Sequence, residues 1–146
     1  MAKIETILVP MDGSDQSFEA AEYAISLAKM MNARIIAIHA FGIPMYVPEY
    51  RGTLFLPTWY DRTRKVAEGW LEKVNVMGRR KDVDVETEVI IDVASVVDAI
   101  VTYAKKKKVD LIVMGTKGRT GLKKFLLGSV ASGVVEYAHC PVLVVR

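Results

Sequence analysis

The stretch MGTKGRTGLKKFLLGS, residues 114–129, carries four glycines and four basic residues and no acidic residue. It lies between a short apolar run, VDLIV, and a helix-like segment, VASGVVEYA. Glycines let backbone N–H groups approach an anion without a Cβ in the way, and lysine and arginine raise the local potential. Gly128 and Ser129 stand where the next helix should begin, and a helix N-terminus presents N–H groups with a partial positive charge. Together these features predict a phosphate-binding loop.

A second polar loop, VPMDGSD, places Asp12 and Gly13 between an apolar run and a helical segment. In open α/β sheets, ligands bind beyond the carboxyl ends of the strands, where the strand order reverses. If the strands that precede the two loops are neighbours, both loops border one crevice. Asp12 can coordinate Mg²⁺ beside bound phosphates, or it can be a turn residue that caps the helix. Ser129 can donate its hydroxyl to a phosphate, act as a helix N-cap, or do both.

Five segments are predicted to form the strands that carry these loops. Four of them are short, nearly continuous apolar runs rich in isoleucine and valine, typical of parallel strands that helices cover on both faces. These four runs are residues 6–10, 34–40, 109–115 and 141–145. The fifth segment, 82–90, alternates valine or threonine with acidic residues, which predicts a peripheral strand with one polar face.

Helical spacing of apolar residues predicts helices over about 15–31, 58–80, 95–108 and 129–138, with Ser14 or Asp15 as the first N-cap. Their apolar stripes are predicted to comprise, in chain order, Phe18, Ala21, Ile25 and Ala28; Val66, Trp70, Val74 and Met77; Val97, Ile100 and Ala104; and Val130, Val134 and Tyr137. Strands and helices therefore alternate, which predicts one doubly wound α/β domain over residues 1–146 with right-handed crossovers.

The glycine loop fits the spacing G-x2-G-x9-G-[ST], the nucleotide-binding signature of the ATP-binding universal stress proteins. The chain resembles this family over essentially its whole length, including ILVPMDGSDQSFEAAEYAISLA, DLIVMGTKGRTGLKKFLLGSVASGVV and CPVLVV. The resemblance implies a five-stranded parallel, Rossmann-like sheet of order 3-2-1-4-5, in which strands 1 and 4 are neighbours. It also implies a regulatory protein of the stress response that switches with bound ATP and usually forms dimers.

The resemblance further implies a set of ATP-binding residues. At the nucleoside end it implies contacts from Pro10 and Asp12, with the backbone of Ala40 meeting adenine. Met114 and Gly115 line the ribose side in this assignment. The phosphates are held by Gly118, Gly128, Ser129 and Val130. One departure from the family pattern is Asp92, which stands after the third strand where many members have glycine.

An enzyme is the main alternative, as a slow ATP hydrolase or a phosphotransfer protein. The sequence contains no G-x4-G-K-[ST] motif and no G-x-G-x-x-G motif, which excludes a P-loop NTPase and disfavours a dinucleotide site. His139 and Cys140 are adjacent, but near a strand their side chains should point apart, so Cys140 is predicted to be a buried thiol. His39 is predicted to be a partly buried residue near the pocket, with a general-base role as the alternative. We therefore expect weak ATPase activity at most.

Composition limits the partners and the compartment. The net charge is +3, and the basic run at residues 105–108 suits a helix C-terminus better than a nucleic-acid patch. Among its 146 residues the chain has one cysteine, no signal-peptide pattern and no apolar stretch long enough to span a membrane, so a cytoplasmic protein is expected.

Two segments are predicted to take part in protein contacts. Residues 42–58 carry three prolines, two glycines and several large apolar side chains, and we expect them to pack as a lid or against a partner. The last strand, VLVV, would form a sheet edge in the order that the resemblance implies, and pairing with the same strand of a second copy would protect it. A homodimer through the C-terminal strand is therefore expected, and a signalling partner remains unnamed by the sequence.

Overall fold

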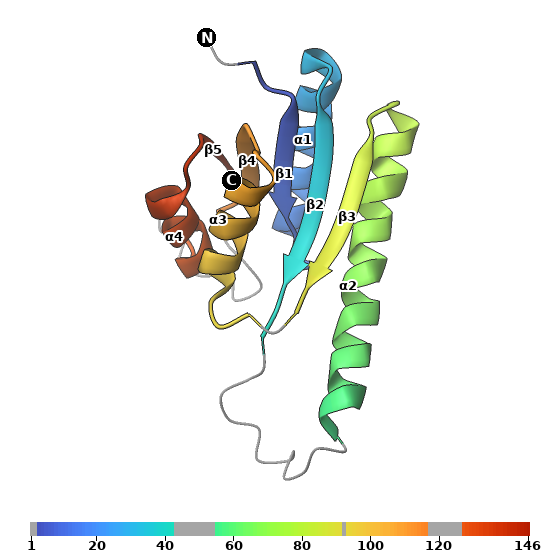
Figure 1. The fold of residues 1–146 in the computed structure, drawn as a ribbon. Coiled ribbons are helices and arrows are strands. Elements are labelled where there is room, and N and C mark those ends of the chain that lie inside the picture. The colour runs from blue at the N-terminus through green and yellow to red at the C-terminus, as the bar shows by residue number, and fades with distance from the viewer. Residues whose placement is uncertain (1–2, 43–54, 92, 117–126) are drawn as a thin grey trace.

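The computed structural model describes residues 3–42, 55–91, 93–116 and 127–146, which form a parallel sheet with helices on both faces (Figure 1). The elements are β1 (Thr6–Pro10), α1 (Asp15–Met31), β2 (Arg34–Ala40), α2 (Phe55–Arg80), β3 (Val85–Ile90), α3 (Val96–Lys106), β4 (Leu111–Gly115), α4 (Ser129–Tyr137) and β5 (Val142–Val145). The sheet order is β3-β2-β1-β4-β5, and each neighbouring pair is parallel. The predicted fold and strand order are confirmed, so β1 and β4 are neighbours and the order reverses between them.

Two apolar layers form because successive residues of a strand point to opposite faces of the sheet. On one face Ile35 and Val113 pack with the apolar residues of α1 and α2. On the other face Ile36 and Ile112 pack with residues of α3 and α4. The two core clusters explain why the central strands are apolar at nearly every position.

The edge strand β3 has the polar face that its alternating sequence predicts. Val85 and Val89 pack into the core on the side of α1 and α2, whereas Glu86 and Glu88 are exposed. Glu86 forms an ion pair with Arg34 of β2, with 3.1 Å between the guanidinium nitrogen and the carboxylate oxygen. The strand itself begins at Val85, later than the predicted start at residue 82.

Helix α2 departs from prediction in its start and in its buried stripe. It begins at Phe55 rather than near residue 58, so it includes the end of the segment predicted to be a lid, whose residues 43–54 lie outside the described structure. Val74 is buried as predicted, but Val66 is 51% exposed, and Ala67 and Leu71, which the prediction left out, are buried. Alanine contributes little to a hydrophobic pattern, so the prediction placed the stripe on the larger Val66. The actual stripe follows steps of four and three residues from Ala67.

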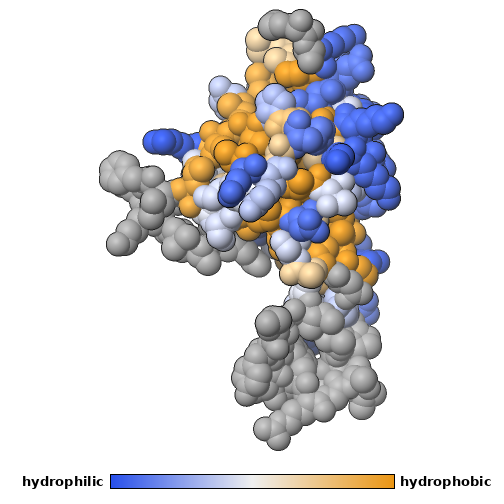
Figure 2. Space-filling view, turned by 60° about the vertical axis from the view of Figure 1, so that its left-hand side comes forward, coloured by the Kyte–Doolittle hydropathy of each residue, from blue (hydrophilic) through white to orange (hydrophobic). Residues whose placement is uncertain are grey.

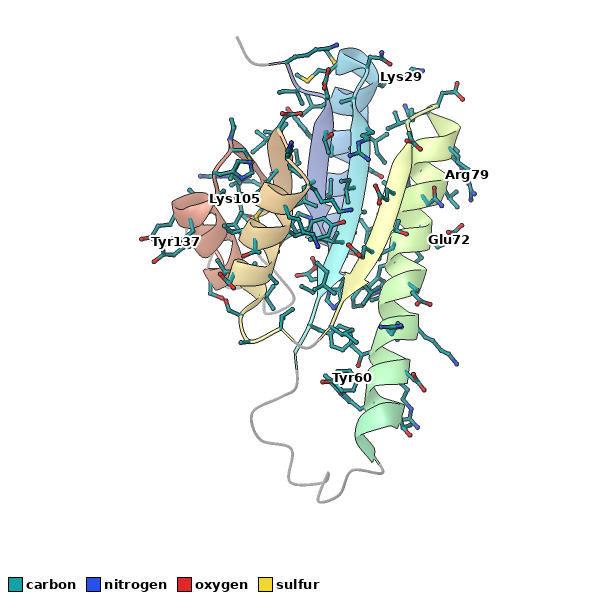
Figure 3. All side chains as sticks on the ribbon, in the orientation of Figure 1. Lys29, Tyr60, Glu72, Arg79, Lys105 and Tyr137 are labelled. Carbon is teal, nitrogen blue, oxygen red and sulfur yellow. The ribbon has the colours of Figure 1, made fainter. Side chains whose placement is uncertain are left out.

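The helix ends follow local side-chain chemistry. Ser14 is the N-cap of α1, and its Oγ accepts a hydrogen bond from the N–H of Ser17. Ser95 caps α3 in the same way, accepting from the N–H of Asp98. In α4, Tyr137 was predicted on the apolar stripe, but it is the last helical residue, is 65% exposed, and points away from the sheet (Figure 3).

The opposite edge of the sheet is β5. The N–H of Ile112 donates to the carbonyl of Pro141, and the N–H of Thr116 donates to the carbonyl of Val145. Because backbone groups alternate in direction along a strand, the N–H and carbonyl groups of Val142 and Val144 point to the open edge of the sheet. Figure 2 turns the side with α4 and β5 toward the viewer and shows hydrophobic residues gathered there. The exposed apolar side chains of α4 include Val135 and Tyr137.

None of the helices in the described ranges is long and apolar enough to cross a membrane.

Candidate functional site

A cavity of about 280 Å³ lies at the carboxyl ends of β1, β2 and β4, where the strand order reverses. Its walls come from the end of β1 and the two residues that follow it, from Ser17 of α1, from the ends of β2 and β4, and from the starts of α3 and α4. Seven of the nine predicted site residues line it: Pro10, Asp12, Ala40, Met114, Gly115, Ser129 and Val130. Gly128 stands next to the lining, at the start of α4, whereas Gly118 lies outside the described residues, as does Asp92.

Asp12 lines the cavity and also shapes its own loop. Its Oδ1 accepts a hydrogen bond from the N–H of Ser14, at 2.9 Å, and another from the Ser14 hydroxyl. Ser14 in turn caps α1, so Asp12 supports the cap through Ser14 without being the cap itself. The turn role that the sequence left as an alternative is therefore present, and it is compatible with a role at the cavity.

The two described ends of the glycine loop are joined by a backbone hydrogen bond. The N–H of Gly128 donates to the carbonyl of Thr116 at 2.7 Å, and Thr116 itself is bonded to β5 through Val145. Gly128 is the N-cap of α4, so of the two roles that the sequence left open for Ser129, that of N-cap is excluded and that of a hydroxyl donor to phosphate stays a prediction. Ser129 is the first helical residue, and its side chain is exposed. Within the described residues no side chain makes a capping hydrogen bond at Gly128, and the first turn of α4, with Ser129, Val130 and Ala131, lines the cavity.

Gly115 has a packing reason that the sequence did not indicate. A Cβ on this residue would lie 3.3 Å from the backbone carbon and oxygen of Gln16, in the first turn of α1. Glycine therefore lets the end of β4 approach the start of α1 closely. The close approach brings Gly115 and Asp12 to the same cavity.

The apolar wall from α3 is not predicted by the sequence. Val96 and Ile100 line the cavity together with Ala131 of α4. On a helix such residues have the spacing of an ordinary core stripe, and Ile100 and Ala131 are indeed buried in the core cluster. Only the knowledge that α3 begins beside the carboxyl ends of the strands could have marked them as part of a site.

The wall at the end of β2 includes His39, which is partly buried as predicted. Its Nδ1 lies 2.6 Å from the carbonyl oxygen of Met11, and because a carbonyl only accepts, Nδ1 carries the proton. The ring also contacts two aromatic side chains. It stacks on Phe41, with centroids 5.8 Å apart, and meets Trp70 of α2 edge to face.

The described residues provide little reactive chemistry. Burial and the nearby carboxylate of Asp110 raise the pKa of the Cys140 thiol, so it stays protonated near neutral pH. No group of three or more histidines, cysteines, aspartates or glutamates in the described ranges could hold a metal ion. The cavity therefore combines an apolar wall, one carboxylate and a helix N-terminus, an arrangement suited to a ligand with an apolar ring and an anionic tail.

Comparisons with known proteins agree with this architecture. The model of the universal stress protein family matches residues 3–146. The universal stress protein MJ0531 of Methanocaldococcus jannaschii is 42% identical over 143 residues, covering 96% of this chain and 81% of the relative. The solved structure of MJ0577, from the same organism, has a TM-score of 0.83 at 25% identity and covers 99% of this chain and 96% of its own.

A second solved structure bears on the cavity. It is a universal stress protein in complex with cAMP, with a TM-score of 0.73 and 28% identity, and it covers 99% of each chain. The family model extends over nearly every residue, and the sheet has the order found in the solved relatives. On these grounds the chain belongs to the universal stress protein family.

Proposed function

We propose that this protein binds ATP in the cavity at the switch point of the sheet and acts as a nucleotide-dependent regulatory protein in the stress response. The observation that carries the proposal is the convergence of seven predicted residues, from four separate segments of the chain, on one cavity. The relative that was solved with cAMP supports an adenine nucleotide as the ligand class.

The proposed pose follows from the chemistry of the walls. Adenine lies against the end of β2, where the backbone of Ala40 reads its polar edge, and the ribose lies beside Met114 and Gly115. This backbone contact favours ATP over GTP. The phosphates lie at the start of α4, where the N–H groups of Ser129 and Val130 and the helix dipole attract negative charge.

Gly128 and Asp12 have narrower roles in this pose. The N–H of Gly128 is already bonded to Thr116, so Gly128 contributes the absence of a side chain rather than a donor. Asp12 is the one carboxylate among the described lining residues, and it would hold Mg²⁺ only together with the phosphate oxygens. Mass spectrometry of the nucleotide released when the purified protein is denatured tests the ligand directly.

Substitution in the glycine loop should abolish nucleotide binding. Gly118 is the second glycine of the G-x2-G-x9-G-[ST] spacing, and Gly118→Val puts a branched side chain where phosphate should lie. We expect the ATP affinity measured by calorimetry to fall at least about a hundredfold, as when several phosphate contacts of about 1–3 kcal/mol each are lost. Gly121→Val is the matched control, because Gly121 is outside the motif. Equal affinities for the two variants would overturn the proposed role of Gly118.

We also propose that two copies of the protein associate through β5. The strand lies at the sheet edge, its four residues are half-buried in the single chain, and its edge-facing residues Val142 and Val144 are apolar. An exposed apolar edge strand invites pairing. Antiparallel pairing with the β5 of a second copy gives a self-complementary interface with two-fold symmetry.

Light scattering checks this interface. At micromolar concentration we expect the unmodified protein to show twice the chain mass of 16.2 kDa. Val144→Pro should shift the mass toward 16.2 kDa, because it removes a backbone donor on the open edge and leaves the bonds of Pro141 and Val145 to β4 in place. Thermal unfolding of the variant shows whether the single chain stays folded. A monomeric unmodified protein, with or without ATP, would exclude the interface.

A further inference from the structure

The loop that presents Asp12 to the cavity is held by side chains from two other elements, β2 and α2. Met11 is 3% exposed, and both of its backbone polar groups are bonded to β2. Its N–H donates to the carbonyl of Ile38 at 2.7 Å, and its carbonyl accepts from Nδ1 of His39 at 2.6 Å. A buried carbonyl that loses its donor is costly, so the His39 bond contributes directly to the position of Met11.

The residue on the other side of Asp12 is held by Trp70. Gly13 has φ +82°, and a Cβ placed on it would lie 2.8 Å from Cδ2 of Trp70 and closer still to Cε2 and Cζ2. The indole therefore occupies the space that a side chain at residue 13 would take. The same indole meets the imidazole of His39 edge to face, with ring centroids 5.1 Å apart and planes at 88°.

These contacts connect into one arrangement. The ring of His39 is fixed by Trp70 on one side and by Phe41 on another, and through Nδ1 it fixes the carbonyl that precedes Asp12. Trp70 fixes the glycine that follows Asp12. Between two immobilised neighbours, the Asp12 carboxylate has a restricted direction, and its bonds to Ser14 restrict it further.

We propose that His39 and Trp70 are positioning residues, which hold residues 11–13 so that Asp12 faces the nucleotide. The expected effect of these residues on ATP affinity rests on the proposed function of the cavity, whereas their expected effect on the position of the loop does not. It assigns α2, none of whose described side chains lines the cavity, a role in ligand binding through Trp70. His39 acts through the Met11 carbonyl rather than as a base.

The test separates the hydrogen bond of His39 from its aromatic contacts. His39→Phe keeps a ring against Trp70 but has no donor for the Met11 carbonyl. His39→Asn loses the ring, but its amide nitrogen can take the place of Nδ1 as the donor. Exposed His139, the other histidine of the chain, gives the matched control His139→Phe. Calorimetry with ATP and residue-resolved amide hydrogen exchange of Met11 and Ser14 are measured for all variants.

For His39→Phe we expect about tenfold weaker ATP binding and about tenfold faster exchange at both amides, as for the loss of one buried hydrogen bond. His39→Asn should recover most of the ATP affinity and most of the protection from exchange, and His139→Phe should match the unmodified protein in both measurements. Equal impairment of the two His39 variants, or none in His39→Phe, would overturn the inference. If His39→Phe does not fold, the Trp70→Phe variant tests the inference instead. We expect faster amide exchange at Ser14 in that variant, and unchanged exchange would contradict the role of the indole.

Failure of the proposed function is distinguishable from failure of this inference. If the unmodified protein binds no nucleotide, ATP binding is wrong, and the exchange rates of Met11 and Ser14 alone decide whether His39 holds the loop.

Discussion

Replacing Gly13 by alanine is expected to lower the free energy of unfolding by about 3 kcal/mol, for two reasons that add. The residue has φ +82°, a conformation that costs an L-residue with a Cβ roughly 1–2 kcal/mol. The new Cβ would also overlap the indole of Trp70, and such overpacking costs about 1–3 kcal/mol. Urea denaturation followed by circular dichroism measures the change, and the slope of the transition shows whether unfolding stays two-state.

Gly69→Ala is the matched control, and its effect should have the opposite sign. Gly69 lies within α2, one residue before Trp70, and among the described residues no atom outside its chain neighbours and the surrounding helix backbone lies within 4 Å of the position its Cβ would take. Alanine in a helix interior is more favourable than glycine by about 0.5–1 kcal/mol, so this variant should be slightly more stable than the unmodified protein. If Gly13→Ala were as stable as Gly69→Ala, the contact between residue 13 and Trp70 would be wrong.

The strands could be predicted because their amino-acid composition depends on how many of their faces are buried. The central runs are apolar at nearly every position since both faces are covered, and β3 alternates because it lies at an edge. Strand order is different, because periodicity carries no information about which strands pair. It came from the resemblance to the universal stress proteins, and the structure confirms it.

Site residues in loops could be predicted better than those on helices. Asp12 and Gly115 stand out because a polar residue just after a buried strand, or a glycine at the end of one, has few roles in an apolar core. Val96 and Ile100 do not stand out, since their spacing is that of a core stripe and the cavity forms only when α3 packs beside the strand ends. The sequence left Ser129 open as a cap of α4 because serine is a common N-cap, whereas the structure has Gly128 there, held by a hydrogen bond to Thr116 that is a tertiary contact.

The helix α2 offers the sharpest comparison between pattern and structure. The sequence places Val66 on its apolar stripe and leaves out Leu71, but Val66 is 51% exposed and Leu71 is 3% exposed. Leu71 packs in the core cluster between α2, α1 and the sheet. The outer face of the helix carries charged residues, including Glu72 and Arg79, whose side chains form an ion pair (Figure 3).

Leu71→Ala should therefore destabilise the protein by about 3 kcal/mol, because it removes buried methyl groups and leaves a cavity that the neighbouring helices fill only in part. Val66→Ala should change the stability by less than about 0.5 kcal/mol, since an exposed valine loses little contact and alanine favours the helix. Urea denaturation of both variants, at equal protein concentration, measures the difference. A greater loss in Val66→Ala than in Leu71→Ala would mean that α2 is rotated about its axis relative to the sheet, and that the stripe predicted from the sequence is the buried one.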